Sequence, residues 1–312
     1  MSSNRQKETI VKNKKLETSA LNANVLVLRN ALFEESGGDK DVTASIASIF
    51  KTFKRNGMNV RLDFSVKLTK KEFTWAFDLT KGAMEQVYDD SGYGWDDEDK
   101  EKELKEDGAR FLIVRDEASN EPVAFCHFRF TVQGEVMQQM TGTTCLYVWD
   151  IQVEVEFQRK GLGGHLLKVL ELIAFQQRMK FVSVPVQVAC TSGIGFISKV
   201  KGYGPDAYLS ELLQFSAEEE GFQVYSKELG TGKTKAVAVP AAPPAAAVTD
   251  TAPAPAPVAT KKADNNVFGF GAAAITTPLK TKAPAMESSP TSIAMADEVA
   301  DLGDAMNRLV VN

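Results

Sequence analysis

Hydrophobic and polar residues alternate along several segments of the chain, and in other segments the hydrophobic residues recur every three or four positions. Alternation is typical of half-buried strands, whereas the longer spacing is typical of amphipathic helices. The alternating segments predict strands over residues 60–66, 109–114, 123–132, 145–155, 181–188 and 222–226. The helical spacing predicts helices over 45–53, 73–88, 163–177 and 194–200, and a run of charges predicts a solvated helix over 96–107.

The order of these elements indicates the class of fold. Asn56-Gly57 is a turn signal before the first strand, and residues 117–122 separate two strands that read as a hairpin. The later elements alternate strand, helix, strand. Antiparallel strands followed by one βαβ crossover predict an α+β fold, with a mixed, mostly antiparallel sheet flanked by helices. We expect a ligand to bind at the crossover.

Composition changes near residue 230. Nine of the twelve prolines lie beyond residue 239, and every tryptophan and tyrosine lies before residue 226. The Ala- and Pro-rich segment 231–290 is typical of a disordered tail, and 291–312 has the spacing of a short amphipathic helix that a partner could bind. We therefore expect the folded domain over 57–230, after a basic, helical N-terminal extension over 1–56.

The overall composition narrows the class of protein. The chain has 312 residues, 44% hydrophobic and 25% charged, as in soluble globular proteins. Three cysteines without a C-x-x-C pair and two histidines favour neither disulfides nor a metal site. No segment has the length of a membrane span, so we expect a cytosolic or nuclear protein. The net charge of -5 argues against nucleic-acid binding by bulk electrostatics.

The segment most informative about chemistry is Gln158-Arg159-Lys160-Gly161-Leu162-Gly163-Gly164, between a predicted strand and a predicted helix. Glycines let the backbone approach a ligand, and the first N–H groups of the helix are free to bind an anion. With the adjacent basic pair, this predicts a pyrophosphate site; an ordinary glycine turn is the alternative. The spacing does not match the G-x-G-x-x-G of dinucleotide sites, nor does 230–234 complete a P-loop motif.

This segment also resembles the [RQ]-x-x-G-x-[GA] acetyl-CoA signature of the GNAT acetyltransferases. Two further segments, Trp75-Ala76-Phe77-Asp78-Leu79-Thr80-Lys81 and Val123-Ala124-Phe125-Cys126-His127-Phe128-Arg129-Phe130, resemble the NatD branch, whose members acetylate the N-terminal serine of histone tails. The resemblance covers about residues 50 to 230. It implies a GNAT fold, acetyl-CoA as cosubstrate without a metal, the N-terminal peptide of a histone as substrate, and a nuclear and cytoplasmic location, with neither nucleic acid nor a membrane required.

The resemblance also implies which residues bind the two substrates. The pantetheine arm and the pyrophosphate of acetyl-CoA are expected at Gln152, Val153, Glu154, Gln158, Arg159, Lys160, Gly161, Leu162, Gly163, Gly164 and His165. The peptide is expected to contact Tyr88, Tyr93, Tyr147, Tyr225 and Trp149, together with the positions of Thr131 and Gln133. Core packing is an equally good interpretation of each tyrosine taken alone.

Asp150 is the candidate catalytic residue. It stands where NatD-type enzymes usually have Glu, a position whose carboxylate takes the proton of the amine directly or through water. Simple alternation places Asp150 on one face of the strand. It places Tyr147, Trp149, Ile151 and Val153 on the opposite face. The alternative role, a buried structural carboxylate, remains equally open.

Three departures from the family pattern concern specificity and catalysis. Thr131 and Gln133 are neutral where relatives carry acidic residues that hold the histone arginine. Ile197 stands where many GNAT enzymes have a tyrosine acid. Thr131 and Gln133, together with Asp150 in place of the usual Glu, favour an alternative function, that of a catalytically weak GNAT-like module that binds acetyl-CoA and is recruited through its C-terminal tail.

Overall fold

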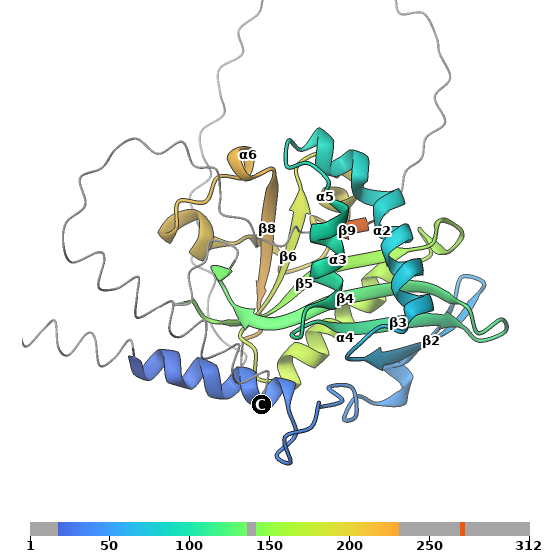
Figure 1. Ribbon diagram of the computed structural model, residues 1–312, viewed down its shortest axis with the longest axis horizontal. Coiled ribbons are helices and arrows are strands. Elements are labelled where there is room, and N and C mark those ends of the chain that lie inside the picture. Colours follow the sequence, from blue (N-terminus) through green and yellow to red (C-terminus); the bar gives the residue numbers. More distant parts are fainter. Residues whose placement is uncertain (1–17, 136–141, 231–268, 272–312) are drawn as a thin grey trace, which may run out of the picture.

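The computed structural model describes residues 18–135, 142–230 and 269–271, which form one mixed sheet with helices on both faces (Figure 1). The strand order is β1-β2-β3-β4-β5-β6-β8-β7, and β9 pairs with β5 beside this path. The strands are β1 (Thr52–Arg55), β2 (Met58–Ser65), β3 (Arg110–Asp116), β4 (Pro122–Val132), β5 (Thr144–Val153), β6 (Phe181–Gln187), β7 (Gly204–Pro205), β8 (Phe222–Glu228) and β9 (Gly269–Gly271).

The helices lie in two layers. They are a helix over 18–32, α2 (Lys70–Asp90), α3 (Asp97–Lys105), α4 (Leu162–Gln176), α5 (Thr191–Ile197) and α6 (Ala217–Glu220), with short turns η1 (Ser48–Phe50), η3 (Val155–Phe157) and η4 (Tyr208–Leu212). On one face, Leu28 of the first helix and Leu166 of α4 pack on the sheet. On the other face, Ala76 of α2 and Leu104 of α3 do so. None of these helices is long and apolar enough to cross a membrane.

The α+β prediction is confirmed, including the single crossover. Every pair of neighbouring strands is antiparallel except β5 and β6, which are parallel and joined through α4. β5 pairs with β6 only at 145–147, opposite 181–183. Beyond Tyr147 the edge of β5 that faces β6 pairs with β9 instead, at Asp150 to Gln152.

The predicted helix over 45–53 is wrong. Only Ser48–Phe50 forms a helical turn, and Thr52–Arg55 forms β1 at the edge of the sheet. The reason is the turn signal that follows, since Asn56 and Gly57 both adopt positive φ, at 53° and 77°. Two such residues form the tight hairpin loop that joins antiparallel strands, so the preceding residues must pair with β2.

The predicted faces of β5 are also wrong, because the strand contains a bulge. The register with β4 shifts between His127 and Phe128, which pair with Asp150 and Val148, and leaves Trp149 as the extra residue. An extra residue reverses the alternation beyond it. Ile151 therefore packs in the same core as Val148, while Asp150 and Trp149 both approach His127.

Several predicted segments lie outside the described residues. These are the basic arm within 1–17, the helix over 291–312 and most of the tail over 231–290. Within that tail, residues 269–271 form β9, which lies close to β6, α2 and α5 as well as β5. The segment expected to be disordered thus contributes a strand to the centre of the sheet.

Candidate functional site

The segment 158–164, here called the glycine turn, lies between η3 and α4 as the sequence predicts. Gly161 caps α4 with a φ of 92°, a conformation that glycine adopts without strain. The first helical hydrogen bond runs from the His165 N–H to the Gly161 oxygen, 3.2 Å away. The N–H groups of Leu162, Gly163 and Gly164 precede that bond, so the helix itself gives them no acceptor. A Cβ added at Gly164 has no heavy atom within 4 Å.

Three hydrogen bonds hold the glycine turn in place. The Gln158 amide donates to the Val153 oxygen (2.8 Å), and the Asn56 amide donates to the Lys160 oxygen (2.8 Å). His165 Nε2 lies 3.0 Å from the Phe50 oxygen, which a protonated Nε2 can donate to. Gln158 and His165 therefore support the turn from within the protein. Arg159, which is exposed, and half-buried Lys160 are its cationic side chains.

The three predicted pantetheine contacts have different surroundings. Gln152 is buried and pairs with Gly269 of β9. Val153 pairs with Ala124 of β4. Glu154 lies just beyond the strand, where its Oε1 accepts a hydrogen bond from Trp75 Nε1 at 2.7 Å. The edge of β5 that faces β6 is thus the place where an extended ligand could pair, and β9 holds part of it.

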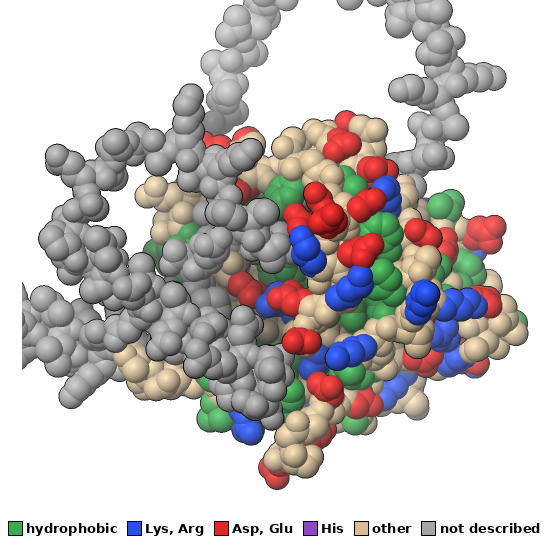
Figure 2. Space-filling model, in the orientation of Figure 1, with side chains coloured by type: hydrophobic (Ala, Val, Ile, Leu, Met, Phe, Trp, Pro, Cys, Tyr) green, Lys and Arg blue, Asp and Glu red, His purple; other side chains and the backbone are tan. Residues whose placement is uncertain are grey.

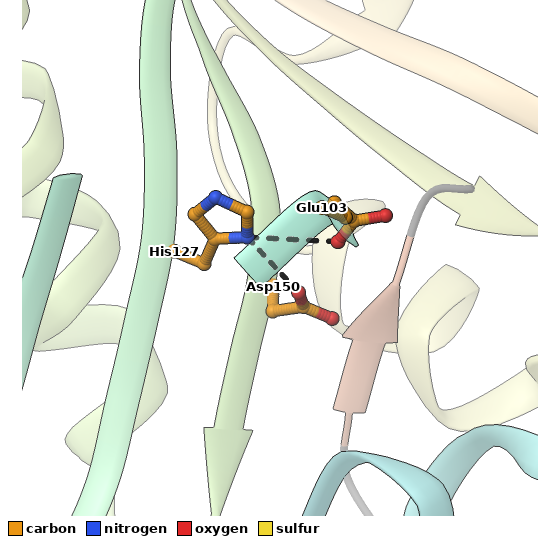
Figure 3. A group of neighbouring side chains, drawn as sticks. All are labelled: Glu103, His127 and Asp150. Carbon is orange, nitrogen blue, oxygen red and sulfur yellow. Dashed lines mark ion pairs between the residues drawn. The ribbon is translucent and has the colours of Figure 1, made fainter. Parts of the chain in front are cut away.

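A second part of the site is a group of four buried side chains, Lys100, Glu103, His127 and Asp150, here called the buried ion cluster. Lys100 and Glu103 come from α3, His127 from β4 and Asp150 from β5. Figure 3 shows Glu103, His127 and Asp150. Lys100 Nζ lies 2.6 Å from Glu103 Oε1 and 3.5 Å from Asp150 Oδ2. His127 Nδ1 lies 3.5 Å from each of the same two oxygens. Each cationic side chain therefore bridges both carboxylates.

Burial and charge set the proton affinities within the buried ion cluster. Burial raises the pKa of Glu103 above its ordinary value, although Lys100 acts against it. Burial also acts to raise the pKa of Asp150, but Lys100 and His127 outweigh it and lower that pKa. Burial acts to lower the pKa of His127, but the carboxylates of Asp150 and Glu103 outweigh it and raise that pKa. The pKa values of the two carboxyl groups thus shift in opposite directions, and Glu103 is the weaker acid.

The charge run over 96–107 predicts a solvated helix, and the structure corrects this for one face of α3. The side chains of Lys100 and Glu103 are only 3% and 1% exposed. Together with buried Leu104, they recur at three- and four-residue spacing, the pattern of a buried helix face. That spacing could have identified the inner face of α3, but the surrounding charges concealed it.

Glu103, His127 and Asp150 also have the donor set of a small metal site, since their ligand atoms lie within 4.8 Å of one another. Lys100 Nζ, however, already lies against both carboxylates. A metal ion would have to share this buried space with an ammonium group, and the two cations would repel each other. The cluster is therefore better described as a set of internal ion pairs.

The aromatic residues predicted to bind peptide fall into two groups. Tyr88 packs edge-on against Tyr93, with ring centroids 5.8 Å apart, and Tyr147 packs against Trp149 at 5.3 Å. Both groups border the buried ion cluster, because Lys100 Nζ is 5.9 Å from the Tyr88 ring centroid and Trp149 stacks on His127 at 6.2 Å. Burial raises the pKa of Tyr88 and of Tyr147, and that of Tyr93 to about 12.

Tyr225 lies apart from the other tyrosines. It packs against the core under α4, whereas Tyr147 and Trp149 belong to the cluster on the opposite face of the sheet. Thr131 and Gln133 are both buried, and Gln133 Nε2 donates to Asp206 Oδ2 at 2.9 Å. Thr131 and Gln133 therefore lie in the protein interior, and the structure does not bring them to one surface with Tyr225.

A cavity with a volume of about 1010 Å³ lies along α2 beside the end of β5. Its lining residues are Lys70, Lys71, Thr74, Trp75, Asp78, Leu79, Gly82, Ala83, Glu154 and Val155. The cavity therefore begins where β5 ends, on the α2 side. On the face of the molecule shown in Figure 2, acidic and basic side chains are interspersed. Such mixing differs from the strongly basic surfaces of nucleic-acid binders.

Comparison with known proteins finds a family model that matches the part of the chain containing the site. Residues 78–203 match the model of the acetyltransferase (GNAT) family. This segment is about two fifths of the chain and includes α3, β4, β5 and the glycine turn.

Solved structures of other acetyltransferases are similar to this chain at a distance. A GNAT-family acetyltransferase from Listeria monocytogenes is 15% identical and has a TM-score of 0.41, covering 57% of this chain and 99% of that chain. Naa50 from Arabidopsis thaliana, in complex with the bisubstrate analogue CoA-Ac-MVNAL, is 16% identical with a TM-score of 0.36, covering 54% and 97%. PaiA N-acetyltransferase from Thermoplasma acidophilum, in complex with coenzyme A, is 12% identical with a TM-score of 0.37, covering 54% and 98%.

Identities and TM-scores this low carry no inference about substrate, so the assignment depends on the family model and on the architecture described above. The mixed sheet has helices on both faces and one crossover, through α4, which begins at the glycine turn. Residues 78–203 thus match the acetyltransferase (GNAT) family model, and the described residues have the mixed sheet, flanking helices and single crossover expected of a GNAT fold.

Proposed function

We propose that this protein transfers the acetyl group of acetyl-CoA to the N-terminal α-amine of another protein, in the manner of the NatD enzymes, with a serine-starting histone tail as the substrate. The observation that carries the proposal is the position of the buried ion cluster, whose Asp150 lies on the same strand that leads into the glycine turn. One continuous segment thus joins a group of proton acceptors to a group of anion donors.

The glycine turn fits the pyrophosphate of acetyl-CoA. The N–H groups at the start of α4 lack acceptors within the helix, and the space beside Gly164 is open. A helix N-terminus favours phosphate through these donors and through its dipole, and Arg159 and Lys160 add positive charge. Bound there, acetyl-CoA supplies the thioester that is to be attacked.

The pantetheine arm is proposed to pair with the edge of β5 at Gln152 and beyond. That edge leaves β6 after Tyr147, which frees backbone N–H and C=O groups for an extended partner. β9 already pairs there from Asp150 to Gln152, so the edge accepts an extended chain. The cofactor arm and β9 therefore compete for one strand edge.

An α-amine is the acceptor that suits this site best. Its pKa is about 7.7 to 8.0, well below that of a lysine side chain, so one carboxylate suffices to deprotonate it near neutral pH. The aromatic rings of Tyr88, Trp95 and Trp149 surround the buried ion cluster. Such walls favour a narrow site for a small first residue such as serine.

Recognition of a histone arginine is the feature with least support among these residues. Thr131 and Gln133 carry no charge, and the amide of Gln133 is occupied by Asp206. A charge-assisted hydrogen bond to a carboxylate contributes about 1.5 to 3 kcal/mol, which this site lacks at those positions. Serine at the first position is therefore expected to matter more than arginine at the third.

The test is to incubate the full chain with acetyl-CoA and the peptide Ser-Gly-Arg-Gly-Lys and to locate the acetyl group by fragmentation mass spectrometry. We expect one acetyl group, on the α-amine. The same peptide with a propionylated N-terminus is the control and should remain unmodified. Acetylation of its lysine would assign the domain to a different class of acceptor. Replacing arginine by alanine should change the rate less than about threefold.

β9 favours a second candidate function, a binding module that holds acetyl-CoA with little turnover. A strand from the chain's own tail pairs at Asp150, the predicted catalytic position. Under this alternative, acetyl-CoA raises the melting temperature while no peptide is acetylated. Turnover of the serine peptide excludes it.

A further inference from the structure

The buried ion cluster contains more groups than a single general base requires, and their contacts are unequal. Glu103 Oε1 lies 2.6 Å from Lys100 Nζ and 3.5 Å from His127 Nδ1. Asp150 Oδ2 lies 3.5 Å from each of the same two nitrogens, and Asp150 Oδ1 accepts from the Gln152 amide at 3.5 Å. Among the described residues, Glu103 Oε2 and Asp150 Oδ2 are both buried atoms without a hydrogen bond. Asp150 Oδ2 is the oxygen that faces Lys100 and His127, whereas Glu103 faces them with its other oxygen, Oε1.

An unpartnered carboxylate oxygen in a buried site is costly unless it binds a proton donor. Figure 3 shows this second oxygen of Glu103 turned away from His127, while the first faces it. One oxygen of Glu103 thus faces Lys100 and His127, and the other is turned away from His127 without a hydrogen bond. In Asp150 the oxygen that does not face Lys100 and His127, Oδ1, accepts from the Gln152 amide at 3.5 Å.

The charges of the buried ion cluster leave room for one proton. Two carboxylates and one ammonium sum to one negative charge when His127 is neutral, and to zero after one proton is added. The titratable groups that interact with Glu103 include Lys100 from its own helix, His127 from β4, Asp150 from β5 and Tyr88 from α2. Tyr93, Arg129 and Tyr147 interact with its charge as well. Tyr88 stays protonated because burial raises its pKa. Accepting one proton therefore neutralises a buried negative charge, which is favourable in a low dielectric.

We propose that Glu103, on α3, is the catalytic residue that accepts the proton of the substrate amine, with Lys100, His127 and Asp150 as positioning residues. The inference rests on the proposed function, since it concerns the base of that reaction. It replaces Asp150 in the role that the sequence resemblance implies, and gives Asp150 the structural role that was its alternative.

The step balances as follows. The ammonium of the substrate gives one proton to Glu103, and the free amine attacks the carbonyl carbon of the thioester. A C–N bond forms, the C–S bond breaks, and a second proton of the attacking nitrogen goes to the departing thiolate. The proton on Glu103 is then released to solvent. The products are the acetylated amine, coenzyme A and one proton.

The difference in proton affinity between the two carboxylates supports this assignment. Burial raises the pKa of Glu103, whereas Lys100 and His127 keep that of Asp150 low in spite of burial. A base with a raised pKa holds the transferred proton more readily near neutral pH. Asp150 stays ionised and keeps Lys100 and His127 in position.

The first test compares Glu103→Gln with Asp150→Asn in the full chain, using coenzyme A release with the serine peptide as the measure of turnover. At pH 7, E103Q should lower kcat at least about 100-fold, the range expected for loss of a general base. At pH 9.5 the α-amine is already deprotonated, so the defect should shrink to about fivefold or less. D150N should lower kcat by a similar factor at both pH values. Glu98→Gln, an exposed position on the same helix, is the matched control and should behave like the unmodified protein.

The opposite pattern, in which high pH restores D150N but not E103Q, would assign the base to Asp150 and overturn the proposal. A second measurement does not depend on turnover. In protein labelled with ¹³C at the carboxyl groups, the signals lost in E103Q and D150N identify the two residues, and Glu103 should titrate at higher pH than Asp150. The reverse order also overturns the inference. An unmodified protein that binds acetyl-CoA without acetylating peptide refutes the proposed function instead, while the titration order still decides which carboxylate is the stronger base.

Discussion

The glycine turn and the buried ion cluster lie on either side of the same strand end, yet they are built in opposite ways. The turn consists of consecutive residues, 158–164, and its donors face open space at the start of α4. The buried ion cluster comes from α3, β4 and β5, and its side chains are almost completely buried. The first is proposed to bind through backbone groups that neighbouring residues in the sequence provide, whereas the second exists only once three elements have packed together. Substitutions in the two regions should therefore fail in different ways.

The largest effect is expected for Lys100→Met. This change leaves Glu103 and Asp150 buried without their ammonium, and removing one partner of a buried ion pair costs roughly 3 to 5 kcal/mol of unfolding free energy. Urea unfolding at pH 8 measures it. Lys102→Met is the control, because Lys102 is exposed and pairs only with Asp99 across the surface, which contributes about 0 to 1 kcal/mol.

The loss in K100M should also depend on pH. Burial raises the pKa of Glu103 above its value in an unfolded chain, and losing the ammonium raises it further. Between the unfolded and folded pKa values the folded variant binds a proton that the unfolded chain does not, so its stability increases as pH falls from 8 toward 5.5. Equal stability of K100M and K102M at pH 8 would show that the cluster contributes no more than a surface ion pair.

A smaller loss, confined to binding, is expected for Gly163→Asp in the glycine turn. The new carboxylate would lie where the pyrophosphate is proposed to bind, so acetyl-CoA affinity should fall at least about 100-fold, equivalent to about 2.7 kcal/mol. Stability should be retained, because an acidic side chain in the first turn of a helix is favourable. Calorimetric titration gives the affinity, and Gly38→Asp, in open space on a distant loop, is the control of equal charge. Unchanged affinity in G163D removes the basis for acetyl-CoA binding at this turn.

The same contrast explains what could be predicted from the sequence. The glycine turn was recognisable because its glycines, basic residues and following helix are neighbours in the chain. The helix α2 was recognisable because its apolar residues repeat at one spacing. Lys100 and Glu103 were not recognisable, since a run of alternating charges is typical of a solvated helix, and only the packing of α3 over His127 and Asp150 buries them.

Two other differences have equally specific causes. Alternation predicts the faces of a strand only when no residue is inserted, and Trp149 is inserted opposite the junction of His127 and Phe128. β9 is only three residues long and lies within an Ala- and Pro-rich segment, where no periodic pattern distinguishes it. Its pairing depends on the free edge of β5, which is a property of the folded sheet.

An intermediate effect is expected where β9 meets that edge. Proline lacks an N–H and does not join inner strands, so replacing both Gly269 and Gly271 by proline should release β9 from β5. If β9 leaves the edge open about one tenth of the time, acetyl-CoA should bind about tenfold more tightly to the variant. The double alanine variant keeps both N–H groups and is the control. An unchanged affinity would mean that β9 and acetyl-CoA do not share the edge.

The smallest effect is expected for Thr69→Ala, a local interaction at the start of α2 that lies outside both regions. The Thr69 hydroxyl accepts from the Glu72 N–H at 3.3 Å, and Glu72 Oε2 accepts from the Thr69 N–H at 2.8 Å, which forms a capping box. Losing such a cap costs about 1 kcal/mol, or about 2 to 4 °C in melting temperature for a domain of this size. Thr69→Ser keeps the hydroxyl and should retain most of this stability. A loss of stability in T69S as large as in T69A would show that the methyl group, rather than the cap, stabilises the helix start. A loss of stability in T69A as large as in K100M would remove the distinction between local and long-range contacts.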